Sequence, residues 1–407
     1  MSDFFKNIGP GSFIAAAFIG PGTVTVCSLA GVQFGFTLLW AMVLSILATL
    51  VLQEMVVRLG LVYGQGLAET VIAEIASPFL KVIAILIILS AIIIGNAAYE
   101  AGNISGGVLG LQTFFNENTI AFIGLRINFL SILIGAISFV LLFIGNYKSI
   151  ERSLIGLVIL MSVSFLVTAI ITKPDMMKVM EGIFVPKLPK EGLLMVLGLV
   201  GTTVVPYNLF LHAALVQEKW KGVKDLKVAR KDALVSILLG GVVSIAIIVC
   251  AAAIGQNEIK DLSGLAKGLE PLYGSFSKYF LSIGLFSAGI TSAITAPLAA
   301  AYVAKECFGW NVGLKSAKFR SVWMFVLFMG VIFSSLGLRP IEIIKFAQVA
   351  NGLLLPIVAG FLLWVVNRNS VLGAYKNSKI QNILGILILV TTIVLGGLSL
   401  LKVFKIV

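Results

Sequence analysis

Long apolar stretches recur along almost the whole chain, and this pattern constrains its fold more than any other feature. The hydrocarbon core of a bilayer is about 30 Å thick, and a helix needs roughly 20 mostly apolar residues to cross it. Hydrophobic residues make up 59% of the 407 residues and charged residues only 12%, about half the usual share in a soluble domain. The sequence therefore predicts an all-α integral membrane protein and excludes a soluble enzyme, a disordered chain and a nucleic-acid-binding domain. Eleven spans are predicted, near residues 11–32, 36–58, 81–111, 126–147, 153–172, 192–217, 232–255, 278–304, 319–337, 341–366 and 383–404.

Lysines and arginines are spread unevenly over the loops between these spans. The net charge of +12 would suggest a polyanionic partner in a soluble protein, but here the basic residues lie mostly in short connections between apolar runs. Counted over alternate connections, 18 of the 30 basic residues fall on the side of the N-terminus and 11 on the other side. Cytoplasmic loops carry the excess of positive charge in membrane proteins. We therefore expect a multi-pass plasma-membrane protein with a cytoplasmic N-terminus and an extracellular C-terminus.

Cysteine gives no sign of a disulfide or metal framework. The three cysteines, Cys27, Cys250 and Cys307, are isolated inside apolar runs and lack metal-ligand spacing. The sequence also has no nucleotide-binding loop and no nucleophile with a base and an orienting group, so we expect neither an enzyme nor a primary pump. We expect one transmembrane domain over residues 1–407, a monomer in the lipid bilayer, with no cofactor, no resident metal ion and no nucleic-acid partner.

Two of the predicted spans are interrupted near their centres. The first contains Gly-Pro-Gly-Thr at Gly20–Thr23, and the sixth contains Val-Val-Pro-Tyr-Asn at Val204–Asn208. Proline removes a backbone donor and clashes with the preceding turn. Ordinary proline kinks are common in membrane helices, but a matched pair of broken helices in two halves is typical of an inverted-repeat transporter with a midplane site. We therefore expect two inverted five-helix repeats, at 11–172 and 192–366, followed by one additional helix at 383–404.

A break of this kind leaves backbone groups that can bind a ligand. The second half-helix begins with free N–H groups and the positive end of its dipole, while the first half-helix ends with free carbonyls. The side chains near the breaks offer hydroxyls and an amide, but no carboxylate, thioether or imidazole for a divalent ion. Thr25 also lies near the first break, and the residues that we expect to line the substrate site from the two breaks are Gly20, Gly22, Thr23, Thr202, Thr203, Val205, Tyr207 and Asn208.

Several motifs resemble those of the Nramp divalent-metal transporters. Residues 8–40 look like the first helix of that family, residues 53–69 like its second helix and the segment that follows, and Pro206–His212 (Pro-Tyr-Asn-Leu-Phe-Leu-His) like its sixth-helix motif. Residues 347–357 resemble its tenth helix. The likeness covers essentially the whole chain. It implies the LeuT-type fold of two inverted five-helix repeats.

The departures from the family concern its metal ligands. Members that carry transition metals have Asp-Pro-Gly-Asn in the first break, where both polar side chains ligate the metal, and Met-Pro-His in the sixth helix, where the sulfur ligates it. This chain has Gly20 and Thr23 at the Asp and Asn positions, and Val205 and Tyr207 at the Met and His positions. A dication without a carboxylate would be a largely uncompensated charge in a low-dielectric site. The resemblance therefore implies the scaffold, and we do not expect metal transport to carry over.

A substrate with its own balanced charges would suit such a pocket. Its carboxylate could meet the free N–H groups, and its ammonium could meet the free carbonyls and the hydroxyls of Thr202 and Thr203. We therefore expect a proton-coupled secondary transporter of small neutral amino acids or similar zwitterions that works by alternating access. The alternative is a divalent metal carrier that holds a hydrated ion through backbone carbonyls, Thr23, Asn208 and Gln348. A third class, a channel or a non-transporting sensor, would have no enclosed midplane site.

Two ionisable residues lie inside predicted spans, where such residues are expected to be functional. His212 is the only histidine and matches a family histidine associated with proton movement; a proton relay and an interhelical hydrogen bond explain it equally well. Glu100 lies on a helix that carries an acidic residue of the family's proton route. For Glu100 we favour proton coupling over a structural salt bridge or a solvated cavity wall.

Two further pairs of polar residues lie on single helix faces. Gln348 and Asn351 are spaced i, i+3 on the tenth span, where the resemblance places Gln348 near the substrate and amide contacts between helices are the alternative. Glu54 and Arg58 are spaced i, i+4 and predict a local ion pair near the cytoplasmic surface, with gating as the lesser alternative.

Overall fold

The structure is a computed structural model, and it describes residues 19–115, 119–122, 125–145, 148–255 and 259–403. Within these ranges nine helical segments are long and apolar enough to cross a membrane, and the helix α8 is a shorter apolar one. The helices are α3 Pro21–Phe34, α4 Leu39–Val62, α5 Leu67–Glu74, α6 Pro78–Leu89, α7 Gly95–Leu111, α8 Phe129–Ile144, α9 Lys148–Ile171, α10 Met176–Phe184, α11 Leu193–Thr203, α12 Pro206–Lys219, α13 Leu226–Ala252, α14 Leu262–Ala266, α15 Glu270–Tyr273, α16 Ser277–Cys307, α17 Ala317–Ser335, α18 Pro340–Val366, α19 Asn369–Leu372 and α20 Lys379–Val403.

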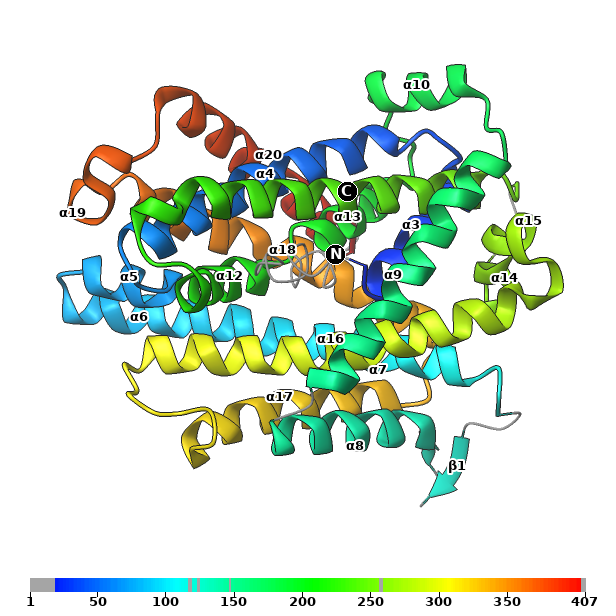
Figure 1. Cartoon of the computed structure of the whole chain (residues 1–407), viewed down its shortest axis with the longest axis horizontal. Helices are drawn as coiled ribbons and strands as arrows, with labels where there is room; N and C mark the ends of the chain where they lie inside the picture. The colour runs from blue at the N-terminus through cyan, green and yellow to red at the C-terminus, as the bar shows by residue number, and fades with distance from the viewer. Residues whose placement is uncertain (1–18, 116–118, 123–124, 146–147, 256–258, 404–407) are drawn as a thin grey trace.

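The predicted helical membrane architecture is confirmed, with one local difference. The span predicted at 126–147 begins only at Phe129, because the strand β2 (Leu125–Asn128) pairs antiparallel with the strand β1 (Thr119–Phe122). Asn128 then starts the helix, since its side-chain oxygen accepts a hydrogen bond from the N–H of Leu130 at 3.0 Å. The hairpin lies at one end of the helical body (Figure 1).

The predicted break in the sixth span is present. α11 ends at Thr203, and α12 begins at Pro206, the first helical position, where proline loses no intrahelical hydrogen bond. Between them Val204 and Val205 leave the helical conformation, with φ/ψ of −96°/73° and −78°/119°.

The predicted break in the first span is described from one side only. Gly20 is extended, with φ/ψ of −79°/175°, and α3 begins at Pro21. The residues before Ile19, which include the first half of the predicted 11–32 span, lie outside the described residues.

Long helices surround the two half-helices that begin at these breaks. α13 packs against α3 and α4, while α7 packs against α16, α17 and α18. Figure 1 shows most of the long helices running roughly parallel, with α4 and α13 on one side of α18 and the helices α7, α16, α17 and α8 on the other. This arrangement encloses α3 and α11, whose residues are mostly buried, and the first two turns of α12, where Pro206–Ala213 are all buried.

Small residues let α7 approach its neighbours closely, as is common where membrane helices pack. A Cβ at Gly110 would lie 2.5 Å from the carbonyl oxygen of Ser282 and 2.6 Å from the backbone nitrogen of Phe286, both on α16. A Cβ at Gly106 would overlap the ring of Pro21, the first residue of α3. The glycines of α7 therefore set how near the scaffold helices come to the broken first helix.

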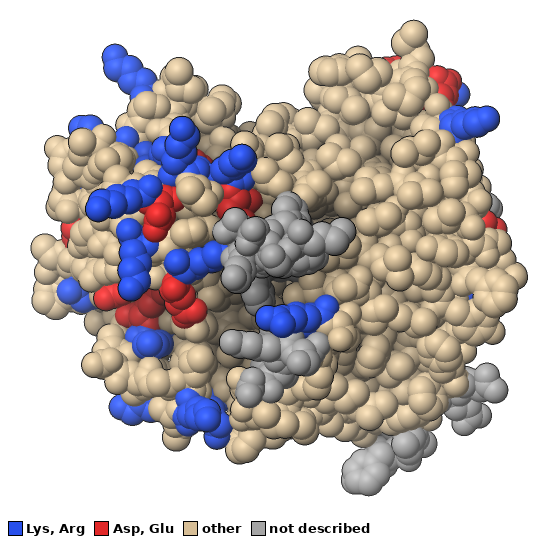
Figure 2. Space-filling model, in the orientation of Figure 1, with Lys and Arg blue, Asp and Glu red and all other residues tan. Residues whose placement is uncertain are grey.

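Charged side chains gather at one end of the molecule. Figure 2 shows lysines, arginines and acidic residues clustered toward the left, where Figure 1 places α5, α12 and α19, while most of the remaining face carries few charges. This segregation is the pattern expected when apolar surface faces lipid and charged connections lie in water.

A substitution at Gly110 tests the close approach of α7 and α16. Gly110→Ala should lower the free energy of unfolding by about 1–3 kcal/mol, because the new methyl group meets backbone atoms that cannot rotate away. Thermal unfolding in detergent measures this effect. The matched control is Gly156→Ala on α9, where nothing lies within 4 Å of the added Cβ. Equal stability of the two variants would contradict the packing described here.

Candidate substrate site at the broken helices

Three side chains at the breaks bury polar atoms that have no hydrogen bond. They are the hydroxyl of Tyr207, both amide atoms of Asn208 and the Oε1 atom of Gln348; none forms a hydrogen bond of ordinary geometry with a described residue, although Tyr99 interacts with both Tyr207 and Gln348. Each side chain is at most 1% exposed. Since buried polar groups almost always have a partner, such a cluster indicates a place where water or a ligand completes the structure.

α18 brings the two breaks together. The side chain of Gln348 lies directly on Gly22, so that a Cβ at this glycine would overlap the amide. The backbone carbonyl of Gln348 touches Gly201 of α11 in the same way, and the Nδ2 atom of Asn351 donates a 3.5 Å hydrogen bond to the carbonyl of Gly201. Gln348 therefore lies between α3 and α11, and Asn351 bonds to α11.

The hydroxyls of Thr202 and Thr203 are used inside α11. Both donate to the carbonyl of Leu199, at 2.8 and 2.9 Å, and Thr203 also contacts the sulfur of Met42 at 3.6 Å. Ser and Thr side chains commonly bond back to their own helix in this way. Each hydroxyl thus donates its hydrogen within α11 while its oxygen can still accept a hydrogen bond, so the expectation that the two hydroxyls contact a substrate stays a prediction. The backbone of Val205 forms part of the break, and its side chain is buried. Thr23 is buried on α3.

Tyr99 is a site residue that the sequence reasoning missed. It lies on α7, its ring centroid is 5.4 Å from that of Tyr207 in an edge-on arrangement, and it also interacts with Gln348. It is 2% exposed. The only sequence signal was a hydroxyl-bearing aromatic residue inside a span, next to Glu100.

Glu100 brings a carboxyl group close to the breaks. It is fully buried, and its Cβ and Cγ pack against Gly330 of α17. Its Oε2 accepts a 3.2 Å hydrogen bond from Nδ2 of Asn103, whereas its Oε1 has no partner among the described residues. It directly follows Tyr99, whose ring contacts that of Tyr207. Among the described residues no basic side chain forms an ion pair with Glu100, which argues against the structural salt bridge.

The comparison with known proteins identifies the family. A family model described as natural resistance-associated macrophage protein-like, Nramp, matches residues 11–402. The chain belongs to the Nramp family. The predicted resemblance is thus confirmed over the whole transmembrane domain.

Relatives of this Nramp protein cover nearly all of it. The divalent metal cation transporters MntH of Caldanaerobacter subterraneus and of Bacillus subtilis are each 25% identical to it; the alignments cover 100% and 98% of this chain and 95% and 92% of the relatives. A metal transporter, the nramp1 homolog of Dictyostelium discoideum, is 29% identical over 72% of this chain and 55% of its own.

Two solved structures establish the fold. The manganese transporter of Eremococcus coleocola superimposes with a TM-score of 0.75 at 19% identity, over 96% of this chain and 85% of that one. Mhp1, a nucleobase-cation-symport-1 family transporter in a closed conformation, gives 0.56 at 14% identity, over 95% and 92%. The LeuT-type fold expected for this Nramp protein is therefore confirmed.

The prediction of amino-acid symport is wrong. The relatives are named as divalent metal cation transporters, which overturns the amino-acid substrate. The structure also fills the region beside Gly22 with protein, because the side chain of Gln348 lies directly on this glycine. The prediction also counted side chains at the breaks alone and so overlooked Glu100 as a nearby carboxyl group.

His212 makes one hydrogen bond across the helix interface. Its Nδ1 atom lies 2.7 Å from Oε1 of Gln53 on α4, and its Nε2 atom is buried without a partner in the part of the chain that the structure describes. The interhelical hydrogen bond that the sequence allowed is thus present, and one ring nitrogen stays available for a proton.

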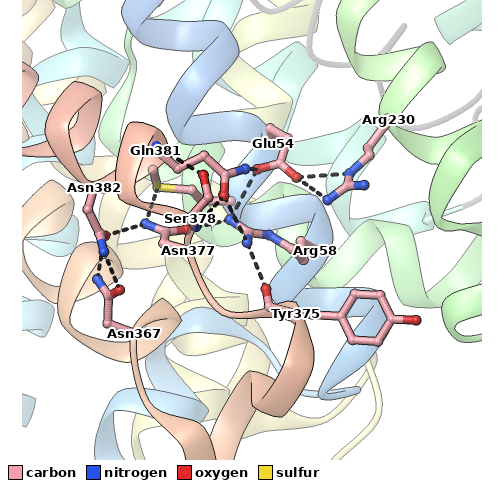
Figure 3. A network of polar contacts seen from close by, with 10 residues as sticks. Glu54, Arg58, Arg230, Asn367, Tyr375, Asn377, Ser378, Gln381 and Asn382 are labelled. Carbon is pink, nitrogen blue, oxygen red and sulfur yellow. Dashed lines mark hydrogen bonds and ion pairs between the residues drawn. The ribbon is translucent and has the colours of Figure 1, made fainter.

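A polar network fastens α4 to its neighbours at the charged end of this Nramp protein (Figure 3). Glu54 forms ion pairs with Arg58 at 3.1 Å and with Arg230 of α13 at 2.6 Å. Arg58, which is 2% exposed, also donates to the carbonyl of Tyr375 at 2.7 Å and to Oδ1 of Asn377 at 2.5 Å. The predicted ion pair of Glu54 and Arg58 therefore extends to α13 and to the connection between α18 and α20.

Removing the charge of Glu54 tests how far this network stabilises the fold. Glu54→Gln leaves the buried guanidinium of Arg58 without its counter-charge, which costs about 3–5 kcal/mol for a fully buried pair. Because the side chain of Glu54 is 25% exposed, we expect a smaller loss of unfolding free energy, on the order of 2–3 kcal/mol. Thermal or denaturant unfolding in detergent measures it.

The control for this experiment is an exposed ion pair. Lys178 and Asp175 are 69% and 51% exposed, so Lys178→Gln should leave stability nearly unchanged. If Glu54→Gln unfolded with the same free energy as this control, the network would not contribute to the stability of the fold.

Proposed function

We propose that this protein is a secondary transporter that carries divalent metal cations across the plasma membrane by alternating access. The observation that carries the proposal is the cluster of buried side-chain oxygens at the breaks, from Tyr207, Asn208 and Gln348, which form no hydrogen bond of ordinary geometry with a described residue, in a family whose relatives are named for divalent metal transport. The proposed topology has a cytoplasmic N-terminus and an extracellular C-terminus. The proposed repeats, inverted relative to each other, span 11–172 and 192–366.

The proposed site holds the ion with neutral oxygens and retained water. Asn208 and Gln348 supply amide oxygens, Tyr207 and Thr23 supply hydroxyls, and α11 directs the negative end of its dipole and its last carbonyls toward the break. Hard divalent ions accept such oxygens, and a small one such as Mg²⁺ keeps several waters. A partly hydrated ion also loses less solvation energy than a fully dehydrated one. Retained water therefore lowers the cost of placing a dication in a site that has no carboxylate at either break.

The charge and chemistry around the site favour hard ions over soft ones. Glu100 is the carboxylate proposed to offset part of the positive charge from its place on α7. Val205, where metal-carrying relatives place a methionine sulfur, offers no soft ligand, and the softness of the donor set determines which transition metals bind. We therefore propose that Mg²⁺ and Mn²⁺ are preferred over Cd²⁺.

Uptake into liposomes tests the proposed substrate. The wild-type protein should take up Mn²⁺ or Mg²⁺, and Asn208→Leu should reduce uptake at low ion concentration at least tenfold, because the variant lacks a ligand worth about 1.4 kcal/mol. The control is Gln217→Leu on the same helix, whose side chain bonds only to the carbonyl of Ala213 at 2.8 Å. Uptake of neither ion by the wild type, or equal uptake by the two variants, would refute the proposed site.

Adding a carboxylate to the break should strengthen binding. Gly20→Asp places a negative charge beside the neutral oxygens, and because electrostatic attraction is strong in a buried site, Mn²⁺ affinity should rise tenfold or more, about 1.4 kcal/mol. Isothermal titration calorimetry measures this. Gly313→Asp adds the same charge at an exposed glycine with nothing within 4 Å and should change nothing. Equal affinities in both variants would mean that the ion binds elsewhere.

Glu100 and His212 are proposed to take part in proton coupling. Glu100 has one carboxylate oxygen without a partner, and His212 has one ring nitrogen without a partner. A buried carboxyl group that gains and loses a proton during the cycle can couple ion movement to a proton gradient. In this scheme protonation neutralises Glu100 and weakens its hold on the cation.

The variant Glu100→Gln tests the coupling role. Glutamine cannot exchange a proton, so accumulation driven by a pH gradient should be lost while exchange of metal ions across the liposome membrane continues. The control Glu181→Gln alters an exposed residue that pairs with Lys187 on the surface and should keep both activities. Accumulation that still follows the pH gradient in Glu100→Gln would exclude this residue as the coupling group.

A further inference from the structure

The environment of His212 restricts which of its ring nitrogens can carry a proton. The ring is fully buried on α12, and Nδ1 lies 2.7 Å from Oε1 of Gln53, which is 1% exposed on α4. An amide oxygen can only accept a hydrogen bond. If Nδ1 carried a lone pair, two acceptors would face each other at hydrogen-bonding distance, which is repulsive. With the Gln53 amide oriented so that Oε1 faces the ring, Nδ1 is therefore the donor.

The protonation state of the second ring nitrogen, Nε2, follows from that of Nδ1. A neutral imidazole protonated on Nδ1 keeps a lone pair on Nε2, and this atom is buried with no partner among the described residues. If Nε2 also carried a hydrogen, the ring would be a buried cation that faces only a neutral amide, which is costly. The arrangement thus leaves a basic nitrogen inside the protein with nothing bound to it.

We infer that Gln53 is a positioning residue, which fixes the orientation and tautomer of His212 so that Nε2 stays free to accept a proton. Histidines that bind metals or move protons commonly have one nitrogen held by such a second residue. On α12, His212 follows Asn208 by four residues, so the two share a helix face. The free nitrogen therefore lies one turn beyond the partnerless amide of the proposed site.

The importance of Gln53 for transport rests on the proposed function, whereas its effect on the tautomer does not. Proton coupling through His212 would fail without the tautomer that Gln53 selects. A protein that held His212 in this way but carried no metal would refute the transport proposal and leave the positioning role intact. The two can therefore be tested separately.

His212 can be observed directly because it is the only histidine in the chain. In full-length protein labelled with ¹⁵N-histidine, the two ring nitrogens give distinct NMR signals for the protonated and the lone-pair state. At neutral pH in lipid the wild type should show a protonated Nδ1 and an unprotonated Nε2. Gln53→Leu should lose this tautomer, because free imidazole has no reason to keep it. Gln53→Glu should retain a protonated Nδ1, because its carboxylate accepts the same hydrogen bond.

The control is Thr49→Val, one turn earlier on α4, where a buried hydroxyl bonds only to the carbonyl of Ser45. Its spectrum should match the wild type, which separates the effect of Gln53 from a general disturbance of α4. A wild-type ring protonated on Nε2, as the opposite orientation of the Gln53 amide would produce, would overturn the inference. An unchanged tautomer in Gln53→Leu would do the same.

Discussion

Backbone that leaves the helical conformation inside a membrane must find hydrogen-bond partners, and the architecture of this protein follows from that constraint. Lipid offers no hydrogen bonds, and each unsatisfied group costs several kcal/mol. The breaks at Gly20 and at Val204–Val205 are therefore enclosed by other helices, and α18 supplies amide side chains to both. Among the described residues, the polar atoms at the breaks that still lack a partner belong to a small set of side chains. We propose that a transported ion binds to these atoms.

Polar residues of α4 connect this helix to three other parts of the protein. Over two turns Gln53 bonds to α12, Glu54 to α13, and Arg58 to the connection that follows α18. One helix thus links the broken sixth helix to the charged end of the molecule. The arrangement separates a network of ion pairs and hydrogen bonds around Glu54 and Arg58 at that end from the proposed site at the centre, so that stability and ligand binding depend on different residues.

The sequence was sufficient to predict the helical membrane fold, the break in the sixth span and the family, because these depend on local properties. Length and apolarity define a span, and proline within one defines a break wherever the helix lies. The contacts between helices could not be predicted from the sequence, because no local pattern shows that Gln348 lies on Gly22 or that Tyr99 lies beside Tyr207. The substrate was mispredicted for the same reason. A carboxylate on α7 is close to the breaks only in the folded protein.

The central claim is that a divalent ion binds between the two helix breaks without a carboxylate from either of them. Anomalous X-ray scattering from crystals soaked in Mn²⁺ measures this most directly, because the signal locates the metal itself. The account predicts a peak within coordination distance of the side-chain oxygens of Asn208 and Gln348. A structure that shows the metal only at the charged end of the molecule, with this region filled by water alone, would contradict it.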